Sequence, residues 1–360
     1  MVKLADIIHN LEKIAPPQLA YEGDRIGLQV GDVGSDVRHI VVAVDPTPAV
    51  VDFAIESKAD LLVTHHPLIF TPLNSLAAGN IVQDRIIKLI KAGVALYVMH
   101  TNYDSAPEGI NDSLANRLEI KVTGNLRANN CARLFKIVVF TPVESVESVR
   151  DAMADAGAGV IGNYSHCSFR TQGIGTFLPQ PGTNPVIGNI GAVQSVEEYR
   201  LEMIVAESNL DEVIDAMIKA HPYEEVAYDI YALENKVSAY GYGRVGKLES
   251  PITLGEFENI VRDRICSGSL CVVGSKDNMV QTVGLCGGSA GKFIKDAKSN
   301  GVDVFLCGEM SYHEMLDADA MGLAVIAAGH YETEKPGMEE LANRLDAEYR
   351  DAQILVEFRP

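Results

Sequence analysis

Residues 61–67 read LLVTHHP, an apolar run that ends in two histidines and a proline. Two other apolar runs also lead into polar residues, HIVVAVDPTP at 39–48 and VALYVMHTNYD at 94–104. Helical spacing follows each run, near 48–58, 80–92 and 109–118. Continuously apolar strands that alternate with helices are typical of parallel sheets covered on both faces. The pattern therefore predicts an α/β fold over residues 1–129.

The same alternation returns between residue 236 and residue 360. Three apolar runs, TVGLCGG (282–288), VDVFLCGE (302–309) and LAVIAAGH (323–330), precede helices expected near 289–299, 311–320 and 336–347. A last strand, AQILVEF at 352–358, closes the chain. We therefore expect one discontinuous α/β core, made of mostly parallel sheets covered by helices, from residues 1–129 and 236–360.

Residues 130–235 show a different pattern of predicted strands and helices. Two helices, containing VRDAMADAG (149–157) and LDEVIDAMIKAH (210–221), share the pattern V-x-x-A-M-x-x-A, and each follows a strand. Two halves of the type strand–helix–strand predict a ferredoxin-like α+β domain. We expect this domain to be inserted into the α/β core.

The composition narrows the class of protein. The 360 residues carry 30 Lys and Arg against 49 Asp and Glu, a net charge of −19. This charge argues against nucleic acid and anionic membrane as partners, because both attract basic surfaces. The sequence contains neither a signal-peptide pattern nor about 18 consecutive apolar residues, so we expect a soluble, cytoplasmic protein. The cysteines at 131, 167, 266, 271, 286 and 307 form no CxxC pair and are predicted to be buried free thiols.

Polar residues gather where the predicted strands end. Ligands of α/β sheets bind beyond the carboxyl ends of the strands. Because Pro67 forces the chain to leave the strand, the rings of His65 and His66 can reach one cleft. The other residues at such positions are His100 and Asp104, Glu309 and His313, and His330 with Glu332 and Glu334.

This set of side chains suits metal ions. His330 and Glu334 lie four residues apart, so one helical turn would put both on one side, and a carboxylate there can bridge two cations. We predict two divalent ions per chain, zinc, iron, manganese or cobalt, held by His65, His66, Asp104, His330 and Glu334. Three imidazoles and two carboxylates leave coordination positions for water or an oxyanion. The alternative is a set of loop histidines and solvated acids.

A glycine-rich turn offers a second candidate site. TVGLCGGSAGKFIKDA (282–297) predicts a strand, a turn and a helix, with Gly287, Gly288, Ser289 and Gly291 at the junction. Glycines allow a close approach to the backbone, and helix N-termini attract anions. The turn is therefore either a cradle for a phosphate or other anionic group, or simply a tight connection.

Five motifs together resemble a known family. THHPLIF (64–70), HTNYD (100–104), GGSAG (287–291), GEMSYHE (308–314) and GHYETE (329–334) are similar, in order and spacing, to the motifs of the NIF-three-like family. Its bacterial members are also labelled GTP cyclohydrolase I type 2 homologues. The resemblance covers the two outer regions, and the insert looks like the PII/CutA-like domain of the longer bacterial members.

The resemblance implies a toroidal homohexamer with dinuclear metal sites. By motif match, the five residues named above would be the metal ligands, Glu334 bridging, and His100, Glu309 and His313 would lie nearby in the cleft. Two features depart from the family pattern. Tyr21 begins YEGDRIGL where the family often has W-D-N-x-G-L, and Glu332 lies close enough to Glu334 to be confused with it as a ligand.

These observations predict a dinuclear metal-dependent hydrolase that acts on a small anionic substrate, and the resemblance implies that it could be GTP cyclohydrolase-like. Metal-activated water would be the nucleophile, and His100, Glu309 or His313 would move protons. Phosphoester or amide hydrolysis would suit the same site. The alternatives are a non-enzymatic metal-binding regulatory or scaffold protein, whose PII-like insert binds an effector or partner, and a protein that handles transition metals.

Overall fold

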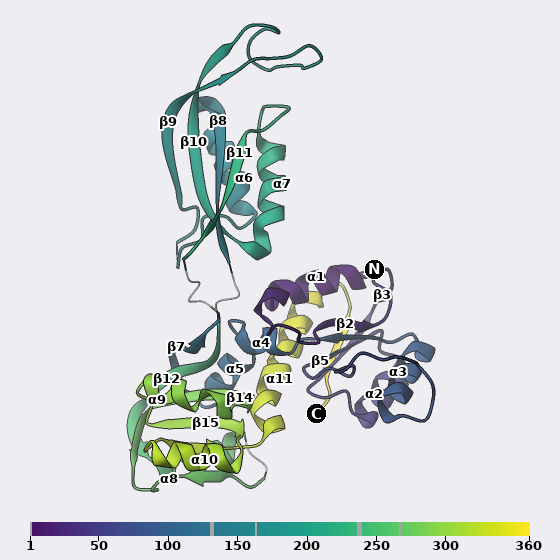
Figure 1. Ribbon diagram of the computed structural model, residues 1–360. Helices are drawn as coiled ribbons and strands as arrows, with labels where there is room; N and C mark the ends of the chain where they lie inside the picture. Colours follow the sequence, from purple (N-terminus) through teal and green to yellow (C-terminus); the bar gives the residue numbers. More distant parts are fainter. Residues whose placement is uncertain (1, 130–132, 163, 236–239, 266–267) are drawn as a thin grey trace. The chain divides into compact units, whose positions relative to one another are not determined.

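The computed structural model in Figure 1 describes residues 2–129, 133–162, 164–235, 240–265 and 268–360. It is a mixed α/β structure with four sheets, some of whose strand pairs are parallel. The chain divides into two compact units, one made of residues 1–131 and 238–360 and the other of residues 132–237. Cys131 and Cys266 lie outside the described residues.

The first unit contains a five-stranded sheet in the order β17-β4-β5-β6-β2. Its strands are β17 (Leu355–Phe358), β4 (His39–Ala43), β5 (Leu61–Thr64), β6 (Ala95–Val98) and β2 (Gly27–Val30). The pairs from β17 to β6 are parallel, and β2 joins β6 antiparallel. The three central strands are buried along their whole length, which is why they read as continuous apolar runs.

Helices α2 (Pro48–Glu56) and α3 (Ile81–Ala92) pack on this sheet, with Val51 and Leu89 in one apolar cluster with Val41 and Leu62. The Thr47 hydroxyl caps α2 by accepting a hydrogen bond from the backbone N–H of Val50 at 3.2 Å. Three more helices of this unit are α1 (Leu4–Ile14), α4 (Thr101–Ser105) and α5 (Ile110–Arg117). A short ribbon of β1 (Val2–Lys3) and β3 (Asp36–Val37) completes this part.

The second sheet of this unit has the order β13-β16-β15-β14-β12-β7. Its strands are β13 (Cys271–Val273), β16 (Ala324–Ala327), β15 (Val304–Glu309), β14 (Met279–Ser289), β12 (Gly241–Thr253) and β7 (Lys121–Ala128). Only β14, β15 and β16 run parallel to one another, so the prediction of mostly parallel sheets is wrong here. One antiparallel pair comes from the insert, because β7 leads into it and β12 returns from it; β12 with β14 and β13 with β16 are antiparallel as well.

Both faces of the six-stranded sheet are covered. Val304 and Leu306 of β15 pack with residues of α5 and α8 (Leu254–Arg264). Phe305 and Cys307 point to the opposite face, towards α9 (Ile294–Ser299) and α10 (Tyr312–Ala320).

The cysteines differ in burial. Cys286 and Cys307 are buried free thiols, as predicted, whereas Cys271 is exposed and Cys167 only partly buried. The prediction of buried thiols is therefore wrong for the last two, which lie in the short strand β13 and in the insert.

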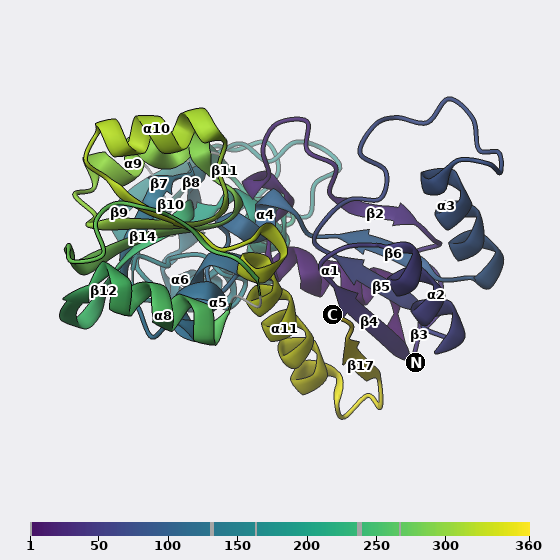
Figure 2. The same cartoon turned by 90° about the horizontal axis from the view of Figure 1, so that it is seen from below.

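The longest helix described, α11 (His330–Tyr349), begins at His330, six residues before the predicted start near residue 336. Figure 2 shows α11 in yellow between the two sheets of this unit, and it contacts β14 and β15 of one sheet and β4 and β17 of the other. The first turn of α11 therefore lies where the two sheets meet.

The second unit has one antiparallel sheet in the order β11-β8-β10-β9. Its elements are β8 (Leu134–Pro142), α6 (Val146–Asp155), β9 (Ser168–Phe177), β10 (Gln194–Ala206), α7 (Leu210–Ala220) and β11 (Tyr228–Leu233). The succession β-α-β-β-α-β is that of ferredoxin-like domains. Val149 and Met153 of α6 and Val213 and Met217 of α7, the repeated V and M positions, are buried in its core.

Among the described residues, no helix is both long enough and apolar enough to cross a membrane.

A buried ion pair joins β12 to the segment that carries Asp104. Arg244, 3% exposed, donates from Nε and Nη2 to the two carboxylate oxygens of Asp112 at 2.8 and 2.7 Å. It also donates to the carbonyl oxygens of Gly241, Gly243 and Ala106 at 2.7 to 2.9 Å. Removing one partner of such a pair leaves an uncompensated buried charge.

We therefore expect Arg244→Met to lower the free energy of unfolding by about 3–5 kcal/mol, measured by urea denaturation. Arg262→Met is the matched control, because the Arg262 side chain is exposed and its partner Glu258 also pairs with Lys276, so its loss should cost less than about 1 kcal/mol. Equal effects of the two substitutions would contradict this account.

Candidate metal centre

Two adjacent histidines turn inward where β5 ends. The backbone N–H groups of His65 and His66 donate to the carbonyl oxygen of Val44, at 3.1 and 3.0 Å, and the Thr64 hydroxyl donates to the carbonyl oxygen of His66. The two ring centroids lie 5.0 Å apart. His65 is fully buried and His66 partly buried, so both rings face one space at the carboxyl edge of the sheet.

Four histidines share one hydrogen-bonding arrangement. In each, Nδ1 faces an oxygen that can only accept, so Nδ1 carries a proton, and Nε2 offers a lone pair whenever the ring is neutral. The pairs are His65 with the carbonyl of Met99 (2.8 Å), His66 with Asp45 (2.8 Å), His100 with Asp24 (2.8 Å) and His330 with Glu309 (3.1 Å). Such outer partners are typical of metal-binding histidines, whose orientation they fix.

The Nε2 atoms of these histidines lie close to one another and to carboxylate oxygens. The Nε2 atoms of His66 and His330 are 3.2 Å apart, and Nε2 of His65 lies 3.6 Å from oxygens of both Asp104 and Glu334. His65 Nε2, Asp104 Oδ1 and Glu334 Oε2 are buried without a hydrogen-bond partner. Two ligands bound at about 2.1 Å to a tetrahedral ion lie about 3.4 Å apart. A cation between these acceptors would satisfy all of them, so the residues fit a metal.

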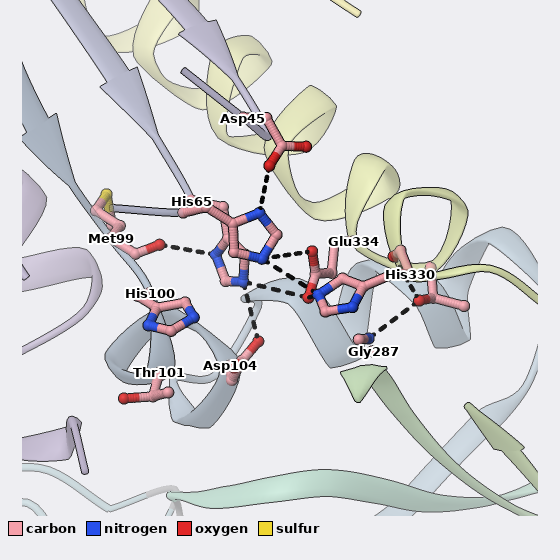
Figure 3. A network of polar contacts seen from close by, with 12 residues as sticks. Asp45, His65, Met99, His100, Thr101, Asp104, Gly287, His330 and Glu334 are labelled. Carbon is pink, nitrogen blue, oxygen red and sulfur yellow. Dashed lines mark hydrogen bonds and ion pairs between the residues drawn. The ribbon is translucent and has the colours of Figure 1, made fainter. Parts of the chain in front are cut away.

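The side chains form two overlapping candidate clusters. One comprises His65, His66 and His100, and the other His66, His330 and Glu334. Within the second, Glu334 lies 3.0 Å from His330 and 3.3 Å from His66. Figure 3 shows Asp104, His65, His330 and Glu334 pointing into one space, with His100 beside them. The structure therefore brings all five predicted ligands together and places His100 beside them.

Charge and burial set the protonation of this centre. Burial alone would lower the pKa of His65, but the charges of Glu334 and Asp104 outweigh burial and raise the pKa to about 9. The hydrogen bond to Glu334 raises the pKa of His330 to about 9. Burial raises the pKa of Asp104; it opposes ionisation of Glu334 as well, but His65 and His330 hold the pKa of Glu334 well below its usual range. Without a metal, protons supply the missing positive charge.

In the predicted anion cradle, Gly287 and Gly288 form hydrogen bonds within the protein. The backbone N–H of Gly287 donates to Asn111, and that of Gly288 to Thr333, so neither donor faces a ligand. A Cβ at Gly288, where φ is +65°, would lie 2.3 Å from Oε1 of Glu334 and 3.1 Å from Nε2 of His330. The glycine makes room for two of the predicted ligands.

The other two cradle residues fit an anion no better. Ser289 is the last residue of β14, opposite Glu309, and a Cβ at Gly291 would meet the Glu314 carboxylate at 2.0 Å. Strand β14 continues through the predicted turn, and α9 begins only at Ile294. In this structure the N–H groups of Gly287 and Gly288 are used within the fold, and the anion cradle stays a prediction.

The remaining predicted residues are dispersed. Glu309 is exposed and holds Nδ1 of His330, so it orients a ligand. His313 is an exposed residue in the first turn of α10, and its ring contacts that of Tyr312. The carboxylate of Glu332 lies over Gly329, whereas that of Glu334 lies in the centre.

Four residues near the centre did not enter the predicted site. Asp45 follows β4, so the rule of strand ends could have found it; Asp24 follows no strand, and only the fold brings it to His100. Tyr21 stacks on Tyr242 with centroids 4.3 Å apart, and its buried hydroxyl has no hydrogen-bond partner. Nζ of Lys292 lies 4.1 Å from the Tyr21 ring, and burial lowers the pKa of this lysine.

Comparison with known proteins gives one consistent result. The model of the family Duf34/NIF3 (NGG1p interacting factor 3) matches residues 2–359. The Bacillus subtilis protein named GTP cyclohydrolase 1 type 2 homolog is 41% identical over 348 residues, which are 97% of this chain and 93% of that protein. A Mycobacterium tuberculosis protein of the same name is 36% identical over 97% of this chain and 92% of its own length. The crystal structure of a Bacillus cereus protein related to NIF3 matches with a TM-score of 0.90 at 42% identity, covering 99% of this chain and 96% of that one.

Metal affinity should rise with pH up to about 9. His65 and His330 are protonated at neutral pH in the metal-free protein, because their pKa values are near 9, and each must lose its proton to bind an ion. Calorimetric titration with Zn²⁺ at pH 7, in buffers of different ionisation enthalpy, should detect release of about two protons per chain. Affinity that is independent of pH between 6 and 8 would contradict this assignment.

Proposed function

Because the chain belongs to the Duf34/NIF3 family, we propose that it is a dinuclear metal-dependent hydrolase acting on a small anionic substrate. The observation that carries the proposal is the set of three Nε2 atoms, of His65, His66 and His330, that face the carboxylates of Asp104 and Glu334. Such a donor set binds divalent cations of the zinc, iron, manganese or cobalt type. When bound, two such ions would lower the pKa of a water molecule and polarise a substrate oxygen.

The geometry supports a division of the ligands into two sets. His65 and Asp104 would hold one ion, His66 and His330 the other, and the Glu334 carboxylate would bridge them, since its oxygens face both sets. No other described acid lies so deep among the histidines: Glu334 is 3% exposed. Glu309 and Asp45 would hold His330 and His66 in the ligating orientation.

His100 is the best-placed proton acceptor. Its Nε2 faces the same space as those of His65 and His66, while Nδ1 is bonded to Asp24. Burial opposes ionisation of Asp24, but hydrogen bonds from His100 and Thr101 hold its pKa well below the usual range. An ionised Asp24 fixes the ring orientation and stabilises the imidazolium that forms when Nε2 takes a proton from the attacking water.

A positive charge near the centre favours an anionic substrate. Lys292 packs over the Tyr21 ring, and the backbone N–H of Tyr21 donates to the Thr101 hydroxyl beside His100. The relatives' name suggests GTP as the first substrate to test. Lys292 would then bind a phosphate oxygen, the role first expected of the glycine-rich turn.

The assembly is also proposed from the family. We propose a homohexamer and a PII/CutA-like character for the insert, whose strand order is compatible with that of such domains. Neither the hexamer nor the insert is needed for the ligand sets described above, which come entirely from the first unit.

The test is turnover by protein loaded with Zn²⁺, Mn²⁺, Fe²⁺ or Co²⁺, assayed with GTP and with p-nitrophenyl phosphate. Turnover should vanish on chelation and in His65→Ala and Glu334→Gln, which lose ligands. His100→Ala should keep bound metal but lose turnover, because it removes only the proton acceptor.

His9→Ala is the matched control, since His9 is exposed on α1 and should leave turnover and metal content unchanged. If metal-replete protein turns over neither substrate class, or if His65→Ala is as active as the parent chain, the hydrolase proposal fails.

A further inference from the structure

The insert contains an apolar cavity of about 440 Å³. It lies at one end of the four-stranded sheet, between the end of β9, the segment that follows it and the segment that leads into β11. The apolar side chains that line it include Phe140, Phe177, Leu178, Pro179, Val186 and Ile187. This volume lies within the range of small-molecule pockets.

The charged groups of this cavity are all acidic. Glu198, Glu224 and Glu225 line it, and no Lys, Arg or His is among the described residues of its wall. Glu224 and Glu225 are exposed at the rim, whereas Glu198, on β10, is only 8% exposed. A carboxylate at this depth loses most of its hydration, and such groups are normally paired with a cation.

Glu198 is held in place by neutral groups. Its Oε1 accepts a hydrogen bond from the Tyr223 hydroxyl at 3.1 Å. Tyr223 is fixed in turn by His221, whose Nδ1 accepts from the backbone N–H of Tyr223 while Nε2 donates to the carbonyl of Phe140. The carboxylate lies against Gly175, where a Cβ would be 2.0 Å from Oε2. These contacts orient the carboxylate without neutralising it.

We propose that this cavity binds a small organic monocation, with an apolar body and one protonated amino group that pairs with Glu198. The apolar wall would bury the body, and Phe177 and Tyr223, whose centroids are 6.2 Å apart, offer ring faces to the ammonium group. One buried carboxylate and one phenol are too few ligands for a metal ion. Nucleotides and other phosphates are disfavoured, because all three charged groups of the wall would repel them.

The test uses the full-length protein and three probes of similar shape: phenethylammonium, neutral 2-phenylethanol and anionic 3-phenylpropionate. Binding is measured by calorimetry and by ligand-observed NMR. We expect the ammonium probe to bind at least about tenfold more tightly than the alcohol, the effect of one charge-assisted hydrogen bond. The carboxylate probe should not bind.

Three variants place the binding at Glu198. Glu198→Gln should weaken binding of the ammonium probe about tenfold or more, because it removes the charge. Gly175→Ala keeps the charge but displaces the carboxylate, and should weaken binding similarly. Glu197→Gln is the matched control: Glu197 is exposed, adjacent in β10 and on the opposite face of the strand, so binding should stay within about twofold.

Thermal melts and metal content must match those of the parent chain in each variant, so that a loss of binding is not a loss of folding. The proposal is overturned if the alcohol binds as tightly as the ammonium probe, if no ammonium probe binds, or if Glu197→Gln and Glu198→Gln behave alike. It is independent of hydrolysis, because the cavity belongs entirely to the second unit.

Discussion

The Nε2 atoms of His65, His66 and His330, which face one another and the carboxylates of Asp104 and Glu334, are the constraint on which the first unit depends. His66 and His330 bring two Nε2 atoms to 3.2 Å, and both rings have used Nδ1 on carboxylates outside the centre. If all these nitrogens were deprotonated, their lone pairs would repel one another and the carboxylate charges would stay uncompensated, which is unfavourable in a site shielded from water. Protons can supply the compensating positive charge in the metal-free protein. Metal ions would supply it as well, and the separations of 3.0 to 3.6 Å between Nε2 atoms and carboxylate oxygens suit two ligands of one ion.

Much of the surrounding structure serves this constraint. His65 and His66 follow β5 and His100 follows β6, so these histidines lie at one edge of the first sheet. Helix α11 begins after a strand of the second sheet, so His330 and Glu334 lie on the opposite side of the centre. Gly288 leaves the space that Glu334 occupies. Arg244 fixes Asp112, close in the chain to Asp104 and to Asn111, whose side chain joins the carbonyl of Asp104 to the backbone of Gly287.

The sequence predicted the parts of the fold and site that depend on local pattern. Apolar runs followed by His65, His100 and His330 identified strands and the ends where ligands gather. Patterns that depend on distant pairing were not predictable: β7 and β12 are antiparallel because the insert separates them, and Asp24 meets His100 across 76 residues. The sequence could not show that the N–H groups of Gly287 and Gly288 bond to Asn111 and Thr333, because no spacing connects these residues.

The central claim is that the Nε2 atoms of His65, His66 and His330, with Asp104 and Glu334, hold two ions. Anomalous diffraction from crystals of metal-replete protein, recorded on both sides of the metal absorption edge, tests it most directly. The account predicts two peaks per chain, about 2.1 Å from Nε2 of His65 in one case and of His66 and His330 in the other, with Glu334 beside both. A single peak away from these atoms, or none while the Nε2 atoms keep their separation, would contradict it.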